Sequence, residues 1–382
     1  MNHAFRVALA SRRLLKPTGA MAVVIELARG FHRCGWDVDI FGEKLNRSVV
    51  LESGAHPHRV FRLPNIKGYR GRVIYARQCE ARFRWARYDL VVGHGDLLRQ
   101  NVLFLHNLIH KTAESIPGKE GRKLDSVGRF HEEMLTHDGF EVCIANSQLM
   151  KDDLVTRFGL DEARIHVAHP GFDPDRFHVL HDPEVRRRRR QSLGLEDGQR
   201  LIGFVTSGDY TKRGLPVLLR ALSLLAPDLR ETARLLVVGG EPLGPFLEMA
   251  EELGVAGAIL YHPRVPDVER LMQVLDVFVH PAYIEEFGLV VQEAMACGIP
   301  VVTSKRVGAS ELMLSGHGVL DAPDPDAFAA ELETLLRRPD VHHQRRAEGL
   351  TATSGNSWEH YVGRVLDVLM GAGLVPSVAV KP

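Results

Sequence analysis

The chain has 382 residues, 45% apolar and 25% charged, which is typical of a folded globular protein and favours two domains, each with its own core. It contains no run of about 18 apolar residues, so no membrane-spanning helix is predicted. The apolar residues 5–10 are too few for a signal peptide and predict a first strand. Four cysteines without a C-x-x-C pair are typical of reduced thiols in a cytosol.

The net charge is zero, but it is unevenly distributed along the chain. Residues 1–170 hold 26 Lys and Arg against 19 Asp and Glu, a surplus of seven positive charges, and the remainder carries the matching negative surplus. A basic first half and an acidic second half predict different partners for the two halves.

Apolar runs in the first half alternate with helical patterns. A helix is predicted at about residues 20–34, and strands are predicted at residues 7–10, 38–41, near 60, 90–92, 102–105, 142–145 and 165–168. Strands separated by helices are typical of a parallel α/β sheet.

Residues 67–88 combine seven Lys and Arg with interleaved aromatic and aliphatic side chains. This composition is typical of a helix on an anionic membrane surface. It is also typical of a solvated helix whose aromatic side chains lie in the core. Nucleic acid is a weaker interpretation, because no binding motif accompanies the charge.

His106 and Asn107 follow the apolar strand at residues 102–105, and His94 follows the strand before it. Active-site groups gather beyond the carboxyl ends of parallel strands, which makes these residues candidates. The alternative is a structural role, the commoner one for a lone histidine. Residues 111–130 are polar and lack a clear period, which predicts either an acceptor-binding loop or plain surface loop.

Turn-forming residues at 168–177 follow a strand and indicate a domain boundary near residue 170. Five consecutive arginines at 186–190 come next. A helix would spread them around its circumference, so we predict a solvated face rather than a nucleic-acid site.

The second half alternates more regularly. Strands are predicted at residues 201–205, 234–238, 258–261, 277–280 and 301–303, with helices at 216–225, 245–253 and 267–275. Lys212 and Arg213 stand between the first of these strands and the next helix. Two cations beside a helix N-terminus stabilise a diphosphate, although a basic pair at a turn is the alternative.

A helix after the strand at 277–280 is predicted to begin beside Phe287, Gly288 and Leu289, whose backbone N–H groups favour an anion such as phosphate. Glu285 lies just before the helix, and Glu293 lies inside it. Two carboxylates do not bind phosphate, but they suit hydroxyl groups. A single site for pyrophosphate, ribose and sugar describes a nucleotide-sugar.

Glu285-x7-Glu293, followed by Ala-Met-Ala-Cys-Gly-Ile-Pro-Val-Val, resembles the E-x7-E signature of family 4 glycosyltransferases, which are retaining enzymes of GT-B fold. The preceding His-Pro-Ala-Tyr is similar to the lipopolysaccharide core glucosyltransferase I branch. The resemblance implies an α/β fold with two facing Rossmann-like domains and a cleft between them. Residues 1–170 would form the acceptor-side domain and residues 171–355 the nucleotide-sugar domain, with 356–382 as a helix crossing back to the first domain and a tail.

The resemblance also implies roles for single residues. Lys212 and Arg213 resemble the family's Arg-Lys-Gly phosphate loop in reversed order, and Arg264 falls in the loop that borders the nucleotide base. Thr18-Gly19 stands where relatives carry Gly-Gly. Gly19 keeps the close backbone approach to donor phosphate, whereas Thr18 is equally suited to capping a helix.

The implied reaction is front-face transfer with the leaving phosphate as base, no covalent enzyme intermediate and no metal or other cofactor. In it, Lys212 and Arg213 stabilise the diphosphate, Glu285 grips the donor sugar, Glu293 holds the ribose, and His106 and Asn107 lie near the reacting sugar. No plausible Asp-x-Asp metal motif is present.

We therefore expect transfer of a hexose, from UDP-glucose in preference to GDP-linked donors, to a glycan or glycolipid of the bacterial cell surface. The protein is expected in the cytoplasm or at the inner face of the plasma membrane. The alternatives are an epimerase, a phosphorylase, or a nucleotide-sugar-binding module without turnover. A dinucleotide dehydrogenase is disfavoured, because no G-x-G-x-x-G opens either half.

Overall fold

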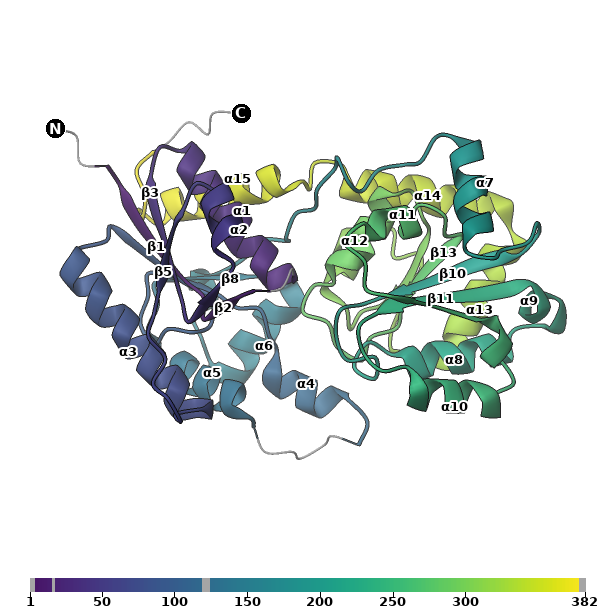
Figure 1. Cartoon of the computed structure of the whole chain (residues 1–382), viewed down its shortest axis with the longest axis horizontal. Coiled ribbons are helices and arrows are strands. Elements are labelled where there is room, and N and C mark those ends of the chain that lie inside the picture. The colour runs from purple at the N-terminus through teal and green to yellow at the C-terminus, as the bar shows by residue number, and fades with distance from the viewer. Residues whose placement is uncertain (1–3, 16–17, 119–123, 378–382) are drawn as a thin grey trace. The chain divides into compact units, whose positions relative to one another are not determined.

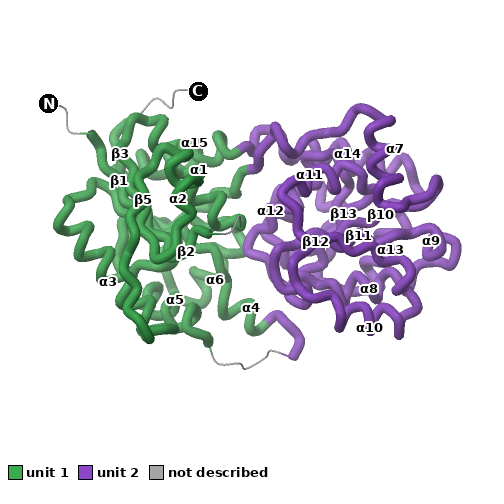
Figure 2. Tube along the Cα trace, in the orientation of Figure 1, with its two compact units in different colours: residues 1–114, 119–171, 358–382 green, residues 115–118, 172–357 purple. Residues whose placement is uncertain are grey.

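The computed structural model of the protein describes residues 4–15, 18–118 and 124–377. These residues form two compact units (Figure 2). Unit 1 comprises residues 1–114, 119–171 and 358–382, and unit 2 comprises residues 115–118 and 172–357. The chain therefore passes from unit 1 to unit 2 after Gly171 and returns after Ser357.

Unit 1 contains an all-parallel sheet whose strand order is β5-β3-β1-β6-β7-β8-β9. Its strands are β1 (Arg6–Ala10), β3 (Asp37–Gly42), β5 (His56–Arg59), β6 (Leu90–Gly93), β7 (Val102–Phe104), β8 (Val142–Ala145) and β9 (Ile165–Val167). A separate small ladder pairs β2 (Arg13–Leu14) with β4 (Lys44–Leu45). The predicted parallel α/β sheet is confirmed, with the third of the predicted strands ending one residue before Val60.

Helices cover both faces of this sheet. On one face, Val7 and Leu9 pack in a core with α1 (Gly19–Arg33) and α15 (Trp358–Gly371), and on the other face Ala8 and Ala10 pack with α3 (Gly68–Ala86) (Figure 1). This alternation follows from the two-residue period of a strand. Gly30 permits the contact between α1 and α15, because a Cβ there would lie 2.3 Å from the Val362 side chain.

The remaining helices of unit 1 are α2 (Arg47–Glu52), α4 (Ile109–Ser115), which ends at the start of unit 2, α5 (Ser126–Thr136) and α6 (Gln148–Phe158). The expectation of an irregular loop over 111–130 is wrong at both ends. Asp125 caps α5 by accepting hydrogen bonds from the backbone of Val127 and Gly128, a short-range signal that the search for periodicity missed. The basic residues Lys119, Arg122 and Lys123 of this segment lie outside the described residues.

Unit 2 is built on a second parallel sheet, with strand order β12-β11-β10-β13-β14-β15. The strands are β10 (Arg200–Val205), β11 (Ala233–Gly239), β12 (Ile259–Pro263), β13 (Val277–His280), β14 (Val301–Ser304) and β15 (Val319–Leu320). One face packs against α8 (Leu215–Leu224) and α13 (Pro325–Arg337), and the other against α11 (Val268–Met272) and α12 (Leu289–Ala296). Further helices are α9 (Pro227–Thr232), α10 (Gly244–Glu252) and α14 (Pro339–Thr353).

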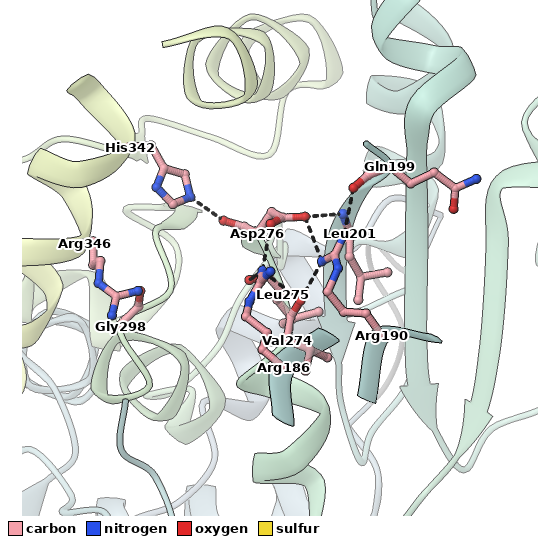
Figure 3. A network of polar contacts seen from close by, with 10 residues as sticks. All are labelled: Arg186, Arg190, Gln199, Leu201, Val274, Leu275, Asp276, Gly298, His342 and Arg346. Carbon is pink, nitrogen blue, oxygen red and sulfur yellow. Dashed lines mark hydrogen bonds and ion pairs between the residues drawn. The ribbon is translucent and has the colours of Figure 1, made fainter. Parts of the chain in front are cut away.

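The arginine run lies on α7 (Pro183–Ser192) and is only partly solvated. Arg186 and Arg190 donate hydrogen bonds to the two carboxylate oxygens of Asp276, at 2.9 and 3.1 Å (Figure 3). Arg189 donates to Gln273 at 2.7 Å. Residues three and four apart share one face of a helix. The predicted solvated face is therefore confirmed only for the exposed residues 187 and 188, while the other three arginines fasten α7 to the start of β13.

Among the described residues, no helix combines the length and the apolar character needed to cross a bilayer.

Candidate active site

The central strand of unit 2 is a point where the chain changes direction across the sheet. From β10 the chain continues to β11 and β12 on one side, whereas β13, β14 and β15 lie on the other side. The connections after β10 and β13 therefore begin at neighbouring strand ends and lead to opposite sides of the sheet. Ligands of open parallel sheets bind at such a switch point. Lys212 and Arg213 follow β10, and Glu285 follows β13, so the fold brings these predicted site residues together.

A glycine fixes the two loops against each other. Gly214 has a positive φ of 80°, and a Cβ there would lie 1.9 Å from the carbonyl oxygen of Pro281. Only glycine accepts both the conformation and this close approach. The backbone N–H of Tyr283 also donates to the carbonyl oxygen of Lys212 at 3.0 Å. The loop that carries the two cations is thereby held against the loop that leads to Glu285.

Two charge pairs connect these loops. Lys212 Nζ lies 2.9 and 3.2 Å from the two carboxylate oxygens of Glu286. Arg213 contacts the carboxylate of Glu285 directly. Both glutamates are buried, with 8% of Glu285 and 6% of Glu286 exposed. The predicted link between the phosphate loop and the first glutamate of the E-x7-E pattern is therefore present as a direct contact.

The pairing controls the protonation of these groups. Burial alone would raise the pKa of Glu286, but Lys212 and Arg213 outweigh it and the pKa lies below its usual value. Burial lowers the pKa of Lys212, and Glu286 partly offsets this. Burial, assisted by Arg213, lowers the pKa of His280 to about 3. His280 is therefore neutral, and its Nε2, 3.4 Å from Glu285, contacts the carboxylate as an uncharged ring.

The helix that carries the second glutamate begins where it was predicted, beside Gly288. Gly288 is the N-cap of α12, with a φ of 94°, and Leu289 is the first helical residue. The terminal amides of the helix are therefore those from Leu289 onward rather than that of Phe287, whose side chain is buried in the core. A helix N-terminus beyond a parallel strand, with two cations nearby, can bind an anion.

Glu293 lies inside α12 in a different environment. Its charged neighbours are Arg176 and Glu269, and burial raises the pKa of Glu293 to about 7 despite Arg176. The sequence analysis placed Glu293 in one site with Lys212 and Arg213. In the structure Glu293 lies on α12, whereas Lys212 and Arg213 lie on the loop before α8 and pair with Glu286 and Glu285. Glu293 is a partly buried carboxyl group that can accept or donate a hydrogen bond.

The loop after β12 carries Arg264, which is exposed. At the start of α1, Thr18 Oγ1 accepts a hydrogen bond from the backbone of Met21 at 3.2 Å, so Thr18 is a helix cap. Gly19 is the first residue of that helix and is exposed, like Thr18. Pro17, which precedes them in the loop, lies outside the described residues.

In unit 1, His106 lies two residues beyond β7, as its position in the sequence predicts. Its Nε2 is 2.9 Å from Nδ1 of His94, which lies directly beyond β6. Asn107 is exposed beside them. The two histidine candidates therefore belong to one contact.

Sequence reasoning missed a buried charged cluster beside these histidines. Asp96 accepts hydrogen bonds from the Arg12 backbone and from Arg72, both at 2.9 Å, and the Arg12 side chain lies 3.0 Å from Glu43. Burial raises the pKa of Asp96. These residues come from three loops and α3, so no local sequence pattern predicts the cluster. Glu286 was also missed, although it stands next to Glu285 in the sequence.

No group of three or more His, Cys, Asp or Glu side chains is arranged to hold a metal ion within residues 4–15, 18–118 and 124–377. The expectation that the reaction needs no metal stays a prediction.

Both units match known glycosyltransferase families. Residues 17–176 match the family described as Glycosyltransferase Family 4, and residues 185–350 match Glycosyl transferases group 1. The chain belongs to the family 4 glycosyltransferases. The prediction made from the E-x7-E pattern is confirmed at this level.

Solved structures show the same fold. WaaG, a glycosyltransferase involved in lipopolysaccharide biosynthesis, is 18% identical with a TM-score of 0.80, over 96% of this chain and 100% of that one. Anabaena HepE, solved in complex with UDP-glucose, is 20% identical with a TM-score of 0.76, over 96% and 99% of the two chains. The predicted GT-B fold is confirmed.

Two curated relatives align with little more than half of this chain. D-inositol 3-phosphate glycosyltransferase of Rhodococcus jostii is 33% identical over 243 residues, which cover 59% of this chain and 51% of the relative. A GDP-mannose-dependent phosphatidylinositol monomannoside mannosyltransferase of Mycolicibacterium smegmatis is 33% identical over 56% of each chain. The chain thus spans about half the length of these relatives. The Corynebacterium diphtheriae D-inositol 3-phosphate glycosyltransferase aligns over 89% of this chain and 86% of its own length, at 28% identity.

Proposed function

We propose that this protein is a retaining glycosyltransferase that moves a hexose from a nucleoside-diphosphate sugar to a glycan or glycolipid acceptor. The observation that carries the proposal is the direct contact between Arg213 of the predicted phosphate loop and Glu285 of the E-x7-E pattern. One switch point thus presents cations for a diphosphate beside a carboxylate for sugar hydroxyls. Family membership supports the same chemistry.

In the proposed mechanism, Lys212 and Arg213 stabilise the leaving diphosphate, together with the N-terminal amides of α12. These charges are preorganised by buried partners, so little reorganisation is needed as negative charge develops. Glu285 accepts hydrogen bonds from the donor sugar and orients its anomeric carbon. Glu293 binds the ribose hydroxyls. The leaving phosphate takes the acceptor proton, without a covalent enzyme intermediate, and the two cations supply the role of a metal ion.

The site is neutral before the donor binds, because the two cations are paired with two glutamates. A diphosphate must therefore compete with Glu285 and Glu286 for Lys212 and Arg213. Glu285 then turns to the sugar, and its exchange of partners couples donor binding to orientation of the anomeric carbon.

UDP-glucose is the favoured donor. The likeness to Anabaena HepE, solved with UDP-glucose, supports it. A GDP-linked hexose is the second candidate, supported by the GDP-mannose-dependent relative from Mycolicibacterium smegmatis. For the acceptor, we propose a bacterial surface glycolipid or polysaccharide, in line with WaaG. The Rhodococcus relative, named for D-inositol 3-phosphate, supports an inositol phosphate as the second candidate.

The test measures binding and turnover separately. Calorimetric titration with UDP, GDP and their glucose and mannose conjugates identifies the donor. Incubation of the bound donor with lipid-linked glycans and with inositol phosphate then measures release of the nucleoside diphosphate. We expect the nucleoside diphosphate to be released only when the acceptor is present. The sugar in the product should keep the anomeric configuration that it has in the donor. Tight binding without release would favour the binding module, and a sugar isomer or sugar phosphate as product would favour the epimerase or the phosphorylase.

We further propose that α3 contacts an anionic membrane at the inner face of the plasma membrane. Arg70, Arg77 and Arg84 recur every seven residues on this helix and are exposed, so they share one face. Trp85 beside them is 88% exposed. Of the other aromatic residues, Tyr75 and Phe83 are buried in the core, as the alternative interpretation of this segment predicts. The surface is therefore an arginine stripe with one tryptophan.

Vesicle sedimentation tests this surface. Arg84→Gln should weaken binding to phosphatidylserine-containing vesicles about fivefold, because one arginine near an anionic surface contributes about 1 kcal/mol. High salt should weaken wild-type binding in the same way. Arg188→Gln, on the exposed side of α7, is the matched control. Equal binding of the wild type to neutral and anionic vesicles would contradict the proposal.

A further inference from the structure

His94 and His106 form a pair of contacting rings at the carboxyl edge of the unit 1 sheet. His94 Nδ1 and His106 Nε2 are 2.9 Å apart, and the ring planes differ by 2°. Parallel rings stacked face to face would keep their atoms farther apart than this. The rings therefore meet edge to edge in nearly one plane, which is the geometry of an N–H···N hydrogen bond.

The surroundings of His94 hold it in place. Its backbone N–H donates to the carbonyl oxygen of Ala10 at 3.1 Å, which joins β6 to the neighbouring β1. Its ring lies over Phe104, with centroids 5.1 Å apart, and only 7% of the residue is exposed. His106, in contrast, is half-buried and reaches the surface. The buried ring is fixed by packing, so it can fix the orientation of the exposed one.

The number of protons in the pair is limited. Burial, assisted by His106, places the pKa of His94 well below its ordinary value, so this ring is neutral and carries one N–H. Its Nε2 is buried and has no hydrogen-bond partner among the described residues. A buried N–H without an acceptor is rarer in folded proteins than an acceptor without a donor. The proton of His94 therefore belongs on Nδ1, facing His106.

We propose that His94 is a positioning residue that donates its Nδ1–H to Nε2 of His106 and so fixes His106 in the Nδ1–H tautomer. His106 can then serve the reaction as an oriented hydrogen-bond donor through Nδ1. It does not serve as an imidazolium acid, because a second proton on Nε2 would face the N–H of His94. This inference rests on the proposed function only for the role of His106 in sugar transfer.

Nuclear magnetic resonance of the protein labelled with ¹⁵N-histidine tests the tautomer without any substrate. The signals of His106 are identified by their loss in His106→Gln. In the wild type we expect a proton on Nδ1 and none on Nε2 of His106. A wild-type His106 protonated at Nε2 would overturn the proposal outright, whatever the activity.

Two substitutions of His94 separate positioning from packing. His94→Asn keeps an N–H near the position of Nδ1, whereas His94→Leu fills similar space without a donor. We expect His94→Leu to let His106 adopt both tautomers. It should also lower kcat for sugar transfer about tenfold, the loss expected for one hydrogen bond. The KM for the donor should change little. His94→Asn should retain both the tautomer and most of the rate.

The outcomes separate this inference from the proposed function. Equal losses in His94→Asn and His94→Leu, with the His106 tautomer unchanged, would assign His94 a purely structural role. If His106→Gln itself keeps the wild-type rate, the proposed role of His106 in transfer fails. The tautomer in the wild-type protein would still decide the hydrogen bond between the two rings.

Discussion

The carboxyl edges of the two sheets carry different kinds of side chain. In unit 2, two cations and two glutamates from adjacent loops form ion pairs beside the start of α12. In unit 1, the corresponding edge presents a hydrogen-bonded histidine pair, of which the buried His94 is neutral, next to arginines already bound by Asp96 and Glu43. Cations in ion pairs suit a highly charged ligand, whereas imidazole rings suit hydroxyl groups. Under the proposed function, we expect donor recognition in unit 2 and contacts with the sugar and its acceptor in unit 1.

The two edges also differ in how strongly a substitution is expected to destabilise the protein. A buried charge left without its partner destabilises a protein strongly. Unit 2 holds Lys212 and Arg213 in such pairs, so isosteric substitutions are the informative ones. Variants of unit 2 should change nucleotide binding, and variants of His106 should not. Three of the following four experiments test that division, and the Glu293 experiment tests the protonation of a buried carboxyl group in unit 2.

Glu285→Gln should have the largest effect. Loss of the carboxylate that orients the donor sugar is expected to lower kcat by about 10³-fold, the scale of a lost transition-state contact. Affinity for UDP should hold or increase, because Arg213 is released from its partner. Steady-state kinetics and calorimetry measure the two effects, with the exposed Glu248→Gln as control. Wild-type turnover would remove Glu285 from the mechanism.

Glu293→Gln should change the pH dependence of stability. The folded protein holds the Glu293 proton up to about pH 7, whereas the unfolded chain releases it near pH 4.5. The folded state therefore binds more protons in this window, and its free energy of unfolding falls as the pH rises from about 4.5 to 7.

The variant lacks this loss, so its stability relative to the wild type should increase by up to about 3 kcal/mol between pH 4.5 and 8. Denaturant unfolding at several pH values measures the difference, and groups that titrate in both proteins cancel. Arg176 opposes the shift and Glu269 adds to it. A constant difference across this range would contradict a buried, proton-holding Glu293.

His106→Gln tests the unit 1 side of the comparison. We expect kcat to fall about 10²-fold, as for removal of one positioned donor, while the Kd for UDP stays unchanged. A loss of UDP affinity equal to the loss in rate would show that the division of labour between the units is wrong.

Lys212→Gln should weaken UDP binding about 30-fold, because hydrogen bonds to charged groups contribute about 2 kcal/mol. Lys305→Gln, which changes an exposed lysine paired with Asp321, is the matched control. Glu286→Gln sharpens the test, since it removes the charge that competes for Lys212 and should strengthen UDP binding. Weaker binding in both variants would mean that Glu286 mainly positions Lys212.

Much of this arrangement follows from contiguous sequence. Apart from β15, which was not predicted, the strands of both sheets lie near their predicted positions, because buried parallel strands are short apolar runs between turn formers. Glu285, Lys212 and Arg213 were singled out because they lie between a strand and a helix and because their motifs resemble those of the family. The same reasoning placed the start of α12 beside Gly288, but only the backbone shows that Gly288 is left-handed.

Other features could not be predicted from local sequence. The cluster of Arg12, Glu43, Arg72 and Asp96 is assembled from three strand ends and a helix, so its members are separated by up to 84 residues. The sequence predicts solvated arginines on α7, but the fold brings Asp276 close enough to accept a hydrogen bond from Arg186. The sequence analysis placed Glu293 in one site with Lys212, but the charged groups that act on it are Arg176 and Glu269.

The sequence alone determined the parallel α/β architecture, the family and the glutamate and cation motifs, because apolar periodicity and glycine positions are local properties of the chain. Only the tertiary structure decided which charges pair and which histidine supports another. Those contacts depend on the order of strands in the sheets, which places the ends of β6 and β7 side by side and the end of β10 next to that of β13.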